Sequence, residues 1–428
     1  MHCMVSRMGF VAAEAILWSF GEQLDRDREV EALGHLLEVM QYAYQLDHGI
    51  KSWRVFLTII RAPHIGTAAV LGLRPSIPVI LHFSAGVRLD LDGVDEALHI
   101  NHPGKMMIPV ILDRFTIHGT NGNHACYVSA PASASLSGAK DGSWIRLFQL
   151  DVARSLAAQL VLVVDFVHAQ GIVHGDLHLG NILLKVPRNF DQLSLNQLYE
   201  KYGAPELDPI VRLDGNPLPP GVPSHGIAPI WLGEASEKIT LSEARILLTD
   251  FGEAFSRSKE RKYESHTPLA IRSPEARFEP NNSLSFPSDI WTLACTIWSI
   301  VAQRPLFEGF LMTEDDMTRE HVDALGILPL EWWRKWEARR LKFTEDGKPI
   351  NRNPFRSWDD RFEDSVQQPR QESGIPSFDA REREAFFDML RPMFSFRPEN
   401  RPTTKQILKS EWMRKWALPE YGKIQDVV

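Results

Sequence analysis

Two short polar segments, each placed behind an apolar run, most constrain what this chain can fold into. The first spans residues 171–184 (GIVHGDLHLGNILL) and contains Asp176 and, five positions later, Asn181. The second spans residues 247–255 (LLTDFGEAF) and contains Asp250. Short apolar runs predict buried strands or helices, and the polar residues that interrupt them predict loops at the edge of a core. The sequence therefore predicts one site built from two loops.

These segments resemble the catalytic loop H-x-D-x-x-x-x-N and the magnesium-binding loop D-F-G of the protein kinase fold. His174 and Gly252 match motif residues for which the resemblance implies structural roles. The resemblance also implies an α+β fold with two lobes, of which the large lobe is mainly helical. The alternative is that these are ordinary loop residues, but further matches downstream favour the kinase interpretation.

The residue types suit ATP-dependent phosphoryl transfer, which needs an oriented hydroxyl, an aligned phosphate and metal ions that absorb charge. Asp176 is the candidate that orients the hydroxyl and takes its proton. Asn181 and Asp250 are candidate Mg²⁺ ligands, since this ion prefers oxygen donors. His178 is a further candidate catalytic residue, because it stands where serine/threonine kinases usually place a phosphate-contacting lysine.

Three matches downstream imply structural roles in the same fold. The segment 267–275 resembles the peptide-positioning loop, and Glu275 matches its closing glutamate. Arg401 matches the arginine that pairs with this glutamate, and Asp289 matches the aspartate that holds the backbone of the catalytic loop. Gly175 stands where many kinases have an arginine that receives an activation-loop phosphate, which argues against phosphorylation as the switch.

The small lobe is incomplete or diverged in pattern. Before Glu96 the sequence has no G-x-G spacing, and its only lysine there is Lys51. Glu96 is the candidate helix glutamate of the ATP site. Residues 1–92 stay unassigned, with a helix expected at 25–44 and strands at 54–60 and 79–83. Either the first strands are diverged or lost, or the sequence carries a foreign beginning.

Residues 93–135 are expected to be the remnant of the small lobe and its hinge. Strands are predicted at 107–115 and 124–129, joined by a glycine- and asparagine-rich turn. The resemblance places the adenine-binding hinge after the second strand, at Ser129, Ala130 and Ala132.

Residues 136–428 are expected to be the large lobe, with a proline-rich insert at about 186–239. The sequence predicts a long buried helix at 144–170, a helix in the insert at 193–201, a strand at 240–249 and a loop at 340–375. It predicts the last core helix at 403–412. Trp332, Trp333 and Trp336 are expected to form a packed helix face.

Composition describes a globular chain with 44% apolar residues, a formal net charge of −8 and three cysteines. The acidic balance argues against direct nucleic-acid binding. The few cysteines indicate a reducing compartment, so we expect a cytoplasmic or nuclear location. No apolar run approaches the length needed to span a bilayer, and we expect a monomer without a membrane partner.

The sequence thus predicts an ATP- and Mg²⁺-dependent protein serine/threonine kinase that resembles the SR-protein kinases and their fungal relatives. A basic, Arg/Ser-rich protein is the expected substrate, and the acidic run 314–316 is the expected docking point for it. Two alternatives stay open. The chain is a pseudokinase that acts as a scaffold, or a small-molecule phosphotransferase of the kinase-like superfamily, whose members share the H-G-D-L-H-x-G-N form.

Overall fold

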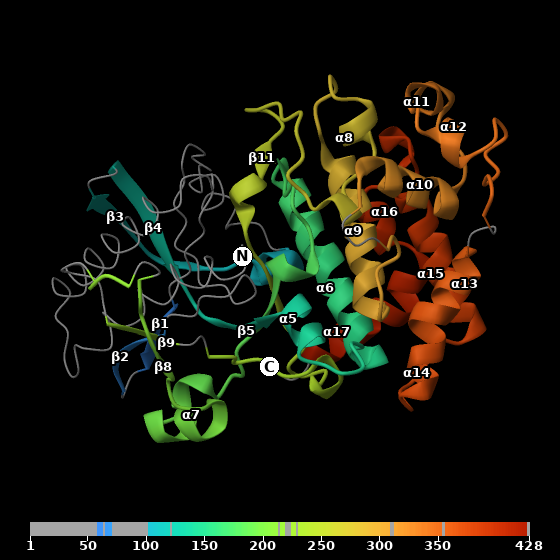
Figure 1. Ribbon diagram of the computed structural model, residues 1–428. Helices are drawn as coiled ribbons and strands as arrows, with labels where there is room; N and C mark the ends of the chain where they lie inside the picture. The colour runs from blue at the N-terminus through green and yellow to red at the C-terminus, as the bar shows by residue number, and fades with distance from the viewer. Residues whose placement is uncertain are drawn as a thin grey trace. The chain divides into compact units, whose positions relative to one another are not determined.

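The computed structural model describes residues 58–62, 65–70, 102–119, 122–212, 215–218, 224–227, 230–308, 312–352 and 356–425. They fall into two compact units (Figure 1). The first comprises the described parts of Met1–Arg88, Pro109–Gly138 and Leu183–Gly233. The second comprises those of Leu89–Ile108, Ala139–Ile182 and Glu234–Val428. The expected helix at 25–44, the strand at 79–83 and Glu96 lie outside the described residues.

The first unit consists mainly of antiparallel strand pairs. The paired strands are β1 (Thr58–Ala62) with β2 (Ile65–Val70), β3 (Ile111–Gly119) with β4 (Gly122–Ser129), β5 (Ala132–Ser135) with β7 (Ile182–Lys185), and β8 (Leu207–Pro209) with β9 (His225–Ile227). The predicted hairpin before the hinge is confirmed. Its first strand begins later than predicted, because Pro103–Met107 forms a 3-10 helix, η2.

The insert contains the predicted helix, α7 (Leu195–Tyr202). It begins with a capping box in which the Ser194 hydroxyl accepts from the Gln197 N–H and the Gln197 side chain accepts from the Ser194 N–H. This reciprocal cap satisfies two helix-end donors. Phe190 and Leu232 form a small apolar cluster beside the helix, so the insert has a packed base of its own.

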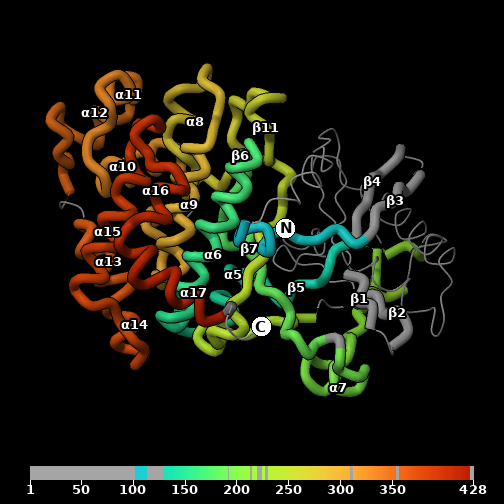
Figure 2. The backbone as a smooth tube through the Cα atoms, turned by 180° about the vertical axis from the view of Figure 1, so that it is seen from behind, coloured from blue at the N-terminus to red at the C-terminus, as the bar shows by residue number. Residues whose placement is uncertain are grey.

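The second unit is a bundle of helices around α6 (Leu150–Ala169), most of whose residues are buried. Figures 1 and 2 show α9, α16 and α17 beside it, and α15 packs against α9. The surrounding helices are α9 (Phe286–Val301), α15 (Ala380–Met393), α16 (Thr404–Leu408) and α17 (Leu418–Gln425). Among the described residues, no helix has the length and apolar character required to cross a bilayer.

Four predictions of secondary structure in this unit are wrong. The long helix begins at Leu150 and not at 144, because Arg146 has a positive φ of 54° and Trp144 is exposed. The predicted strand at 240–249 shrinks to β10 (Ile246–Leu248). The segment 340–375 is not a loop, since its described part contains α12 (Arg339–Lys342), α13 (Trp358–Phe362), a π-helical turn and α14 (Gln368–Glu372). The helix at 403–412 is not the last, because α17 follows and contacts α6.

The expected tryptophan face is confirmed. Trp332 and Trp333 lie on α11 (Leu330–Lys335), Trp336 follows it, and all three are buried. They pack with Phe278 and Phe343, and the Phe278 ring stacks on Trp332. The helix face is therefore part of the core.

Candidate active site

The backbone of the predicted catalytic loop is held by a buried carboxylate on α9. The Asp289 oxygens accept hydrogen bonds from the backbone N–H groups of His174, at 2.8 Å, and Gly175, at 2.9 Å. The His168 ring Nε2 lies 2.9 Å from the same carboxylate. Hydrogen bonds to a charged acceptor are stronger than neutral ones. The loop therefore has a fixed backbone before any ligand is considered.

Asp176 and Asn181 are joined within this loop. The Asn181 side-chain nitrogen donates to the Asp176 carbonyl, at 2.9 Å, and to its carboxylate Oδ2, at 3.3 Å. The Asn181 carbonyl accepts from both the backbone N–H and the hydroxyl of Thr249, at 2.9 Å and 3.0 Å. Thr249 immediately precedes Asp250, so these contacts tie the two predicted loops together.

Asp250 has an unusual backbone conformation. Its φ of 62° and ψ of 64° are left-handed, which is uncommon outside glycine and often marks functional positions. It precedes the 3-10 helix η6 (Phe251–Glu253). The next residue, Phe251, lies against the His174 ring with centroids 4.8 Å apart, and His174 Nε2 lies 3.1 Å from the Thr249 carbonyl. Burial lowers the pKa of His174, so its ring is a neutral packing element.

His178 lies directly beside the candidate base. Its Nε2 atom is 3.5 Å from Asp176 Oδ2, and its Nδ1 atom accepts from the Gly180 N–H at 3.0 Å. The second contact fixes the ring plane. The structure thus brings the histidine next to Asp176.

Asn181 and Asp250 fit a Mg²⁺ ion by their chemistry. Both side chains are mostly buried, and one offers an amide oxygen and the other a carboxylate. The Asn181 amide uses its nitrogen in its two hydrogen bonds to Asp176, so its oxygen can face a cation. Mg²⁺ is usually held by one or two protein oxygens together with substrate phosphates. Within the described residues there is no cluster of three or more His, Cys, Asp or Glu side chains that could hold a metal alone.

The structure joins Glu275 to Arg401 by a bidentate ion pair. The guanidinium Nη1 and Nη2 atoms lie 2.8 Å and 2.7 Å from the two carboxylate oxygens. Arg401 also donates to the carbonyls of Ser395 and Pro287, and both members of the pair are buried. These bonds fasten the end of the activation segment, residues 250–275, to the helical core.

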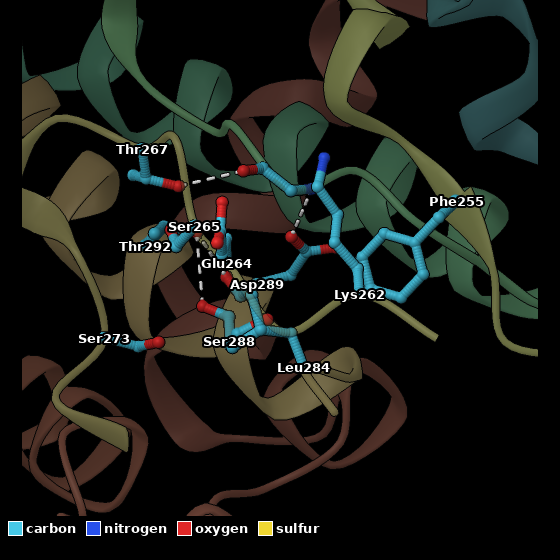
Figure 3. Close-up of a pocket in the computed structure, with 11 residues that line it drawn as sticks. Phe255, Lys262, Glu264, Ser265, Thr267, Ser273, Leu284, Ser288, Asp289 and Thr292 are labelled. Carbon is cyan, nitrogen blue, oxygen red and sulfur yellow. Dashed lines mark hydrogen bonds between the residues drawn. The ribbon is translucent and has the colours of Figure 1, made fainter. Parts of the chain in front are cut away.

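Gly175 has two reasons to be a glycine. Its φ is +78°, and a Cβ atom at this position would lie 2.8 Å from the Glu253 carbonyl oxygen. Its own carbonyl accepts from the Thr267 hydroxyl at 2.8 Å. Figure 3 shows Thr267 and Asp289 beside a cavity of about 10 Å³, room for about one water molecule. A larger residue at position 175 would therefore displace the activation segment at Glu253.

Sequence reasoning missed a charged cluster in the same segment. The Glu253 carboxylate contacts both Lys262 Nζ and His266 Nδ1, the latter at 2.8 Å. Burial opposes the charge of Glu253, but the bonds from Lys262 and His266 outweigh it and lower the pKa of the carboxyl. The spacing of these residues follows no regular period, so no pattern in the sequence pointed to them.

The predicted hinge residues belong to the first unit. Ser129 ends β4 and is buried, Ala130 is exposed, and Ala132 begins β5 opposite Lys185 of β7. The residues after β4 thus lead directly into another paired strand.

The acidic run 314–316 is largely used by the fold itself. It forms the first turn of α10 (Glu314–Leu325), where Asp316 caps the helix with Thr313 and lies 3.0 Å from Lys342 Nζ. The Thr313 and Lys342 bonds lower the pKa of Asp316 to about 2. Asp315 accepts from Arg277 at 2.5 Å and from Trp336 at 2.8 Å. The run therefore offers a basic peptide less charge than the sequence suggested.

Comparisons with known proteins give matches to protein kinases. Residues 236–413 match the protein kinase domain family. Serine/threonine protein kinases of two Aspergillus fumigatus strains are each 23% identical over 318 residues, which cover 73% of this chain and 70% of the relative. The serine/threonine-protein kinase AFC2 of Arabidopsis thaliana is 22% identical over 287 residues, covering 67% of this chain and 58% of that protein.

These matches support the eukaryotic protein kinase superfamily for this chain. The match to a solved crystal structure of a kinase domain covers 86% of this chain and 98% of that chain, with a TM-score of 0.48 and 15% sequence identity. The mixed, mainly helical architecture is consistent with the two-lobed kinase fold predicted from the motifs.

Proposed function

We propose that the chain is an ATP-dependent protein serine/threonine kinase whose catalytic base is Asp176. The observation that carries the proposal is the linked geometry of the two loops. Asn181 bonds to Asp176 with its side chain, and to Thr249, the neighbour of Asp250, with its carbonyl. A base and two oxygen ligands are thereby held in one framework, which suits a reaction that depends on positioning.

In this proposal each residue has a separate task. Asp176 orients the acceptor hydroxyl and takes its proton, while Asn181 keeps the Asp176 carboxylate in place. Mg²⁺, when bound, neutralises charge on the phosphates, and Asn181 and Asp250 hold it. His178, beside Asp176 at 3.5 Å, limits the positions that the carboxylate can adopt. Ser129, Ala130, Ala132 and Glu96 keep their predicted roles in ATP binding.

The test separates the base from the metal ligand. Asp176→Ala should reduce phosphate transfer by roughly 10²–10⁴-fold and leave the affinity for Mg·ATP nearly unchanged, because it contacts the acceptor and not the phosphates. Asp250→Asn should weaken Mg·ATP binding itself, measured as the ligand-induced shift in melting temperature. Near-normal turnover of the first variant, or an unchanged shift in the second, would contradict the assignment.

A second candidate function, a scaffold without catalysis, is favoured by one observation. The sequence before Glu96 has no G-x-G spacing and only Lys51 as a candidate strand lysine. A scaffold would transfer phosphate to no peptide or small-molecule acceptor. The Asp176→Ala variant of a scaffold would still bind the same protein partners as the wild type. Transfer to a small-molecule acceptor alone would instead favour the phosphotransferase alternative.

For the substrate we propose a basic, Arg/Ser-rich protein segment, on the basis of the net acidic chain and the resemblance to SR-protein kinases. Transfer to an Arg-Ser repeat peptide should exceed transfer to an acidic serine peptide of equal length. The preference should shrink at high salt, since exposed charges are screened beyond about 8 Å at physiological ionic strength. Equal rates on both peptides would reject this preference and keep the kinase proposal.

A further inference from the structure

We propose that Glu253 is a positioning residue that holds the activation segment in its peptide-binding arrangement without phosphorylation. The inference rests on the proposed kinase function. Glu253 lies three residues after Asp250, and its carboxylate reaches Lys262 and His266 in the middle of the segment, just before the predicted peptide-positioning residues 267–275. One side chain thus spans the loop that leads to the predicted peptide-positioning residues.

The contacts show how the loop is closed. Lys262 Nζ donates to the Glu253 carboxylate and also, at 3.0 Å, to the Glu253 backbone carbonyl. The Lys262 carbonyl accepts from the Leu284 N–H at 2.7 Å. Lys262 is therefore fixed by both its side chain and its backbone, and the carboxylate links it to the start of the segment.

Two neighbouring contacts complete the fastening. The strand β11 (Phe255–Ser256) pairs with β6 (Ile172–Val173), and the Thr267 hydroxyl bonds to the Gly175 carbonyl at 2.8 Å. Lys262 and His266, the two partners of Glu253, lie between these points along the chain. Without Glu253, Lys262 and His266 would lose their side-chain link to the start of the segment.

The charge pattern explains why no phosphate is needed. In kinases whose activation loop is ordered by phosphorylation, the new negative charge pairs with arginine side chains. Here the negative charge is already encoded as Glu253, and its cationic partners come from the segment itself. Gly175 leaves the room that this arrangement requires, because a Cβ there would meet the Glu253 carbonyl at 2.8 Å.

The experiment measures peptide and ATP kinetics of the full chain before and after phosphatase treatment. The wild type should keep its activity after treatment. Glu253→Gln should raise the KM for the peptide by about fivefold to tenfold, the loss expected for a partly exposed ion pair with two partners, and change the KM for ATP little. Activity that disappears with phosphatase, or a KM unchanged in the variant, would overturn the proposal.

A charge exchange and a matched control make the result specific. Lys262→Glu should raise the peptide KM in the same way, and combining it with Glu253→Lys should recover part of the loss. Glu260→Gln removes one carboxylate from an exposed position of the same segment and should leave the peptide KM at its wild-type value. Equal effects of Glu260→Gln and Glu253→Gln would show that net charge alone matters, which would also overturn the proposal.

Hydrogen exchange separates this inference from the proposed function. If the wild type transfers phosphate to no acceptor, the kinase proposal fails, while amide exchange over residues 256–268 still reports the order of the segment. Glu253→Gln should exchange faster there than the wild type, and Glu260→Gln should not. Identical exchange in all three proteins would show that Glu253 does not position the segment.

Discussion

Charged side chains link both ends of helix α9 to distant segments, but in opposite ways. At the N-terminal end, the helix supplies the charge. Asp289, in the first turn, accepts from the backbone of His174 and Gly175 in the predicted catalytic loop. Arg401, while paired with Glu275, donates to the Pro287 carbonyl and lies over the Trp291 ring at 5.1 Å.

At the C-terminal end, the helix receives charge. Lys140 Nζ donates to the carbonyls of Ser299, at 2.5 Å, and Ala302, at 2.6 Å. Arg370 donates to the Val301 carbonyl at 2.9 Å. Both side chains are buried, and they donate to carbonyls at the C-terminal end of the helix, where intrahelical donors run out.

The two ends agree with the helix dipole, which favours a carboxylate at the N-terminus and cations at the C-terminus. The two ends differ in their structural role. The N-terminal end positions the predicted active site, whereas the C-terminal end anchors α9 to α5 (Leu136–Asp141) and α14. We therefore expect damage at the first end to affect catalysis and stability, and damage at the second to affect stability alone.

The largest effect is expected for Asp289→Ala. The substitution leaves the backbone donors of His174 and Gly175 without their buried acceptor, which should lower the free energy of unfolding by about 3–5 kcal/mol. It should also reduce kcat by roughly 100-fold, because small displacements of a catalytic group are costly. Urea unfolding and steady-state kinetics measure the two effects.

The control is Asp289→Asn, which keeps one side-chain oxygen as an acceptor and should lose less on both measures. If Asp289→Ala unfolds at the wild-type urea concentration and keeps its turnover, the carboxylate does not hold the loop. The N-terminal end would then have no role in positioning the predicted active site.

The next largest effect is expected for the Glu275–Arg401 pair. Each single substitution to alanine should destabilise by about 3 kcal/mol, because it leaves the buried partner uncompensated. The double variant should lose less than the sum, since both changes remove one interaction.

A matched control is the exposed pair Arg381–Glu411, whose atoms lie 3.2 Å apart with side chains 70% and 43% exposed. Such a pair should contribute at most about 1 kcal/mol. Additive losses in the Glu275–Arg401 double variant would mean that the two residues do not stabilise each other.

The N-terminal end could be predicted from the sequence and the C-terminal end could not. Motifs in the sequence identified Asp289, Glu275 and Arg401. Each of them acts on another side chain or on one defined loop, and such a role requires a particular residue type that a motif can show. Lys140 and Arg370 act on backbone carbonyls. Every residue carries a carbonyl, so their partners leave no trace in the sequence.

The same reasoning applies to the candidate site. Asp176, Asn181 and Asp250 were predicted because the chemistry demands their residue types. The left-handed φ of Asp250 and the close approach of Gly175 to Glu253 depend on how the loops pack, and the sequence did not show them. The same holds for the acidic run 314–316, whose cationic partners Arg277 and Lys342 lie on other segments.

A smaller effect is expected for Arg370→Met, at the C-terminal end. The guanidinium is fully buried and donates to the carbonyls of Phe148, Val301 and Pro376. Their loss should destabilise by about 2 kcal/mol, since the methionine fills much of the space but donates nothing. Turnover at a temperature where the variant is folded should equal that of the wild type. A fall in kcat without unfolding would show that this end also serves the site.

The smallest effect at neutral pH is expected for Lys140→Met, and it should depend on pH. Burial, with the nearby cations Arg146 and Arg370, lowers the pKa of Lys140 to about 7. Between this pKa and the ordinary value of about 10.4, the unfolded chain binds a proton that the folded chain does not. The contribution of Lys140 to stability should therefore decrease as the pH falls from 10 to 7, by up to about 1.4 kcal/mol for each pH unit.

Near pH 7 the free energy of unfolding of Lys140→Met should differ from that of the wild type by about 1 kcal/mol or less, and the difference should be larger at high pH. Urea unfolding of both proteins from pH 7 to pH 10 measures this difference. A constant difference across the range would show that Lys140 stays charged on its two carbonyls throughout, so that its burial does not lower its pKa.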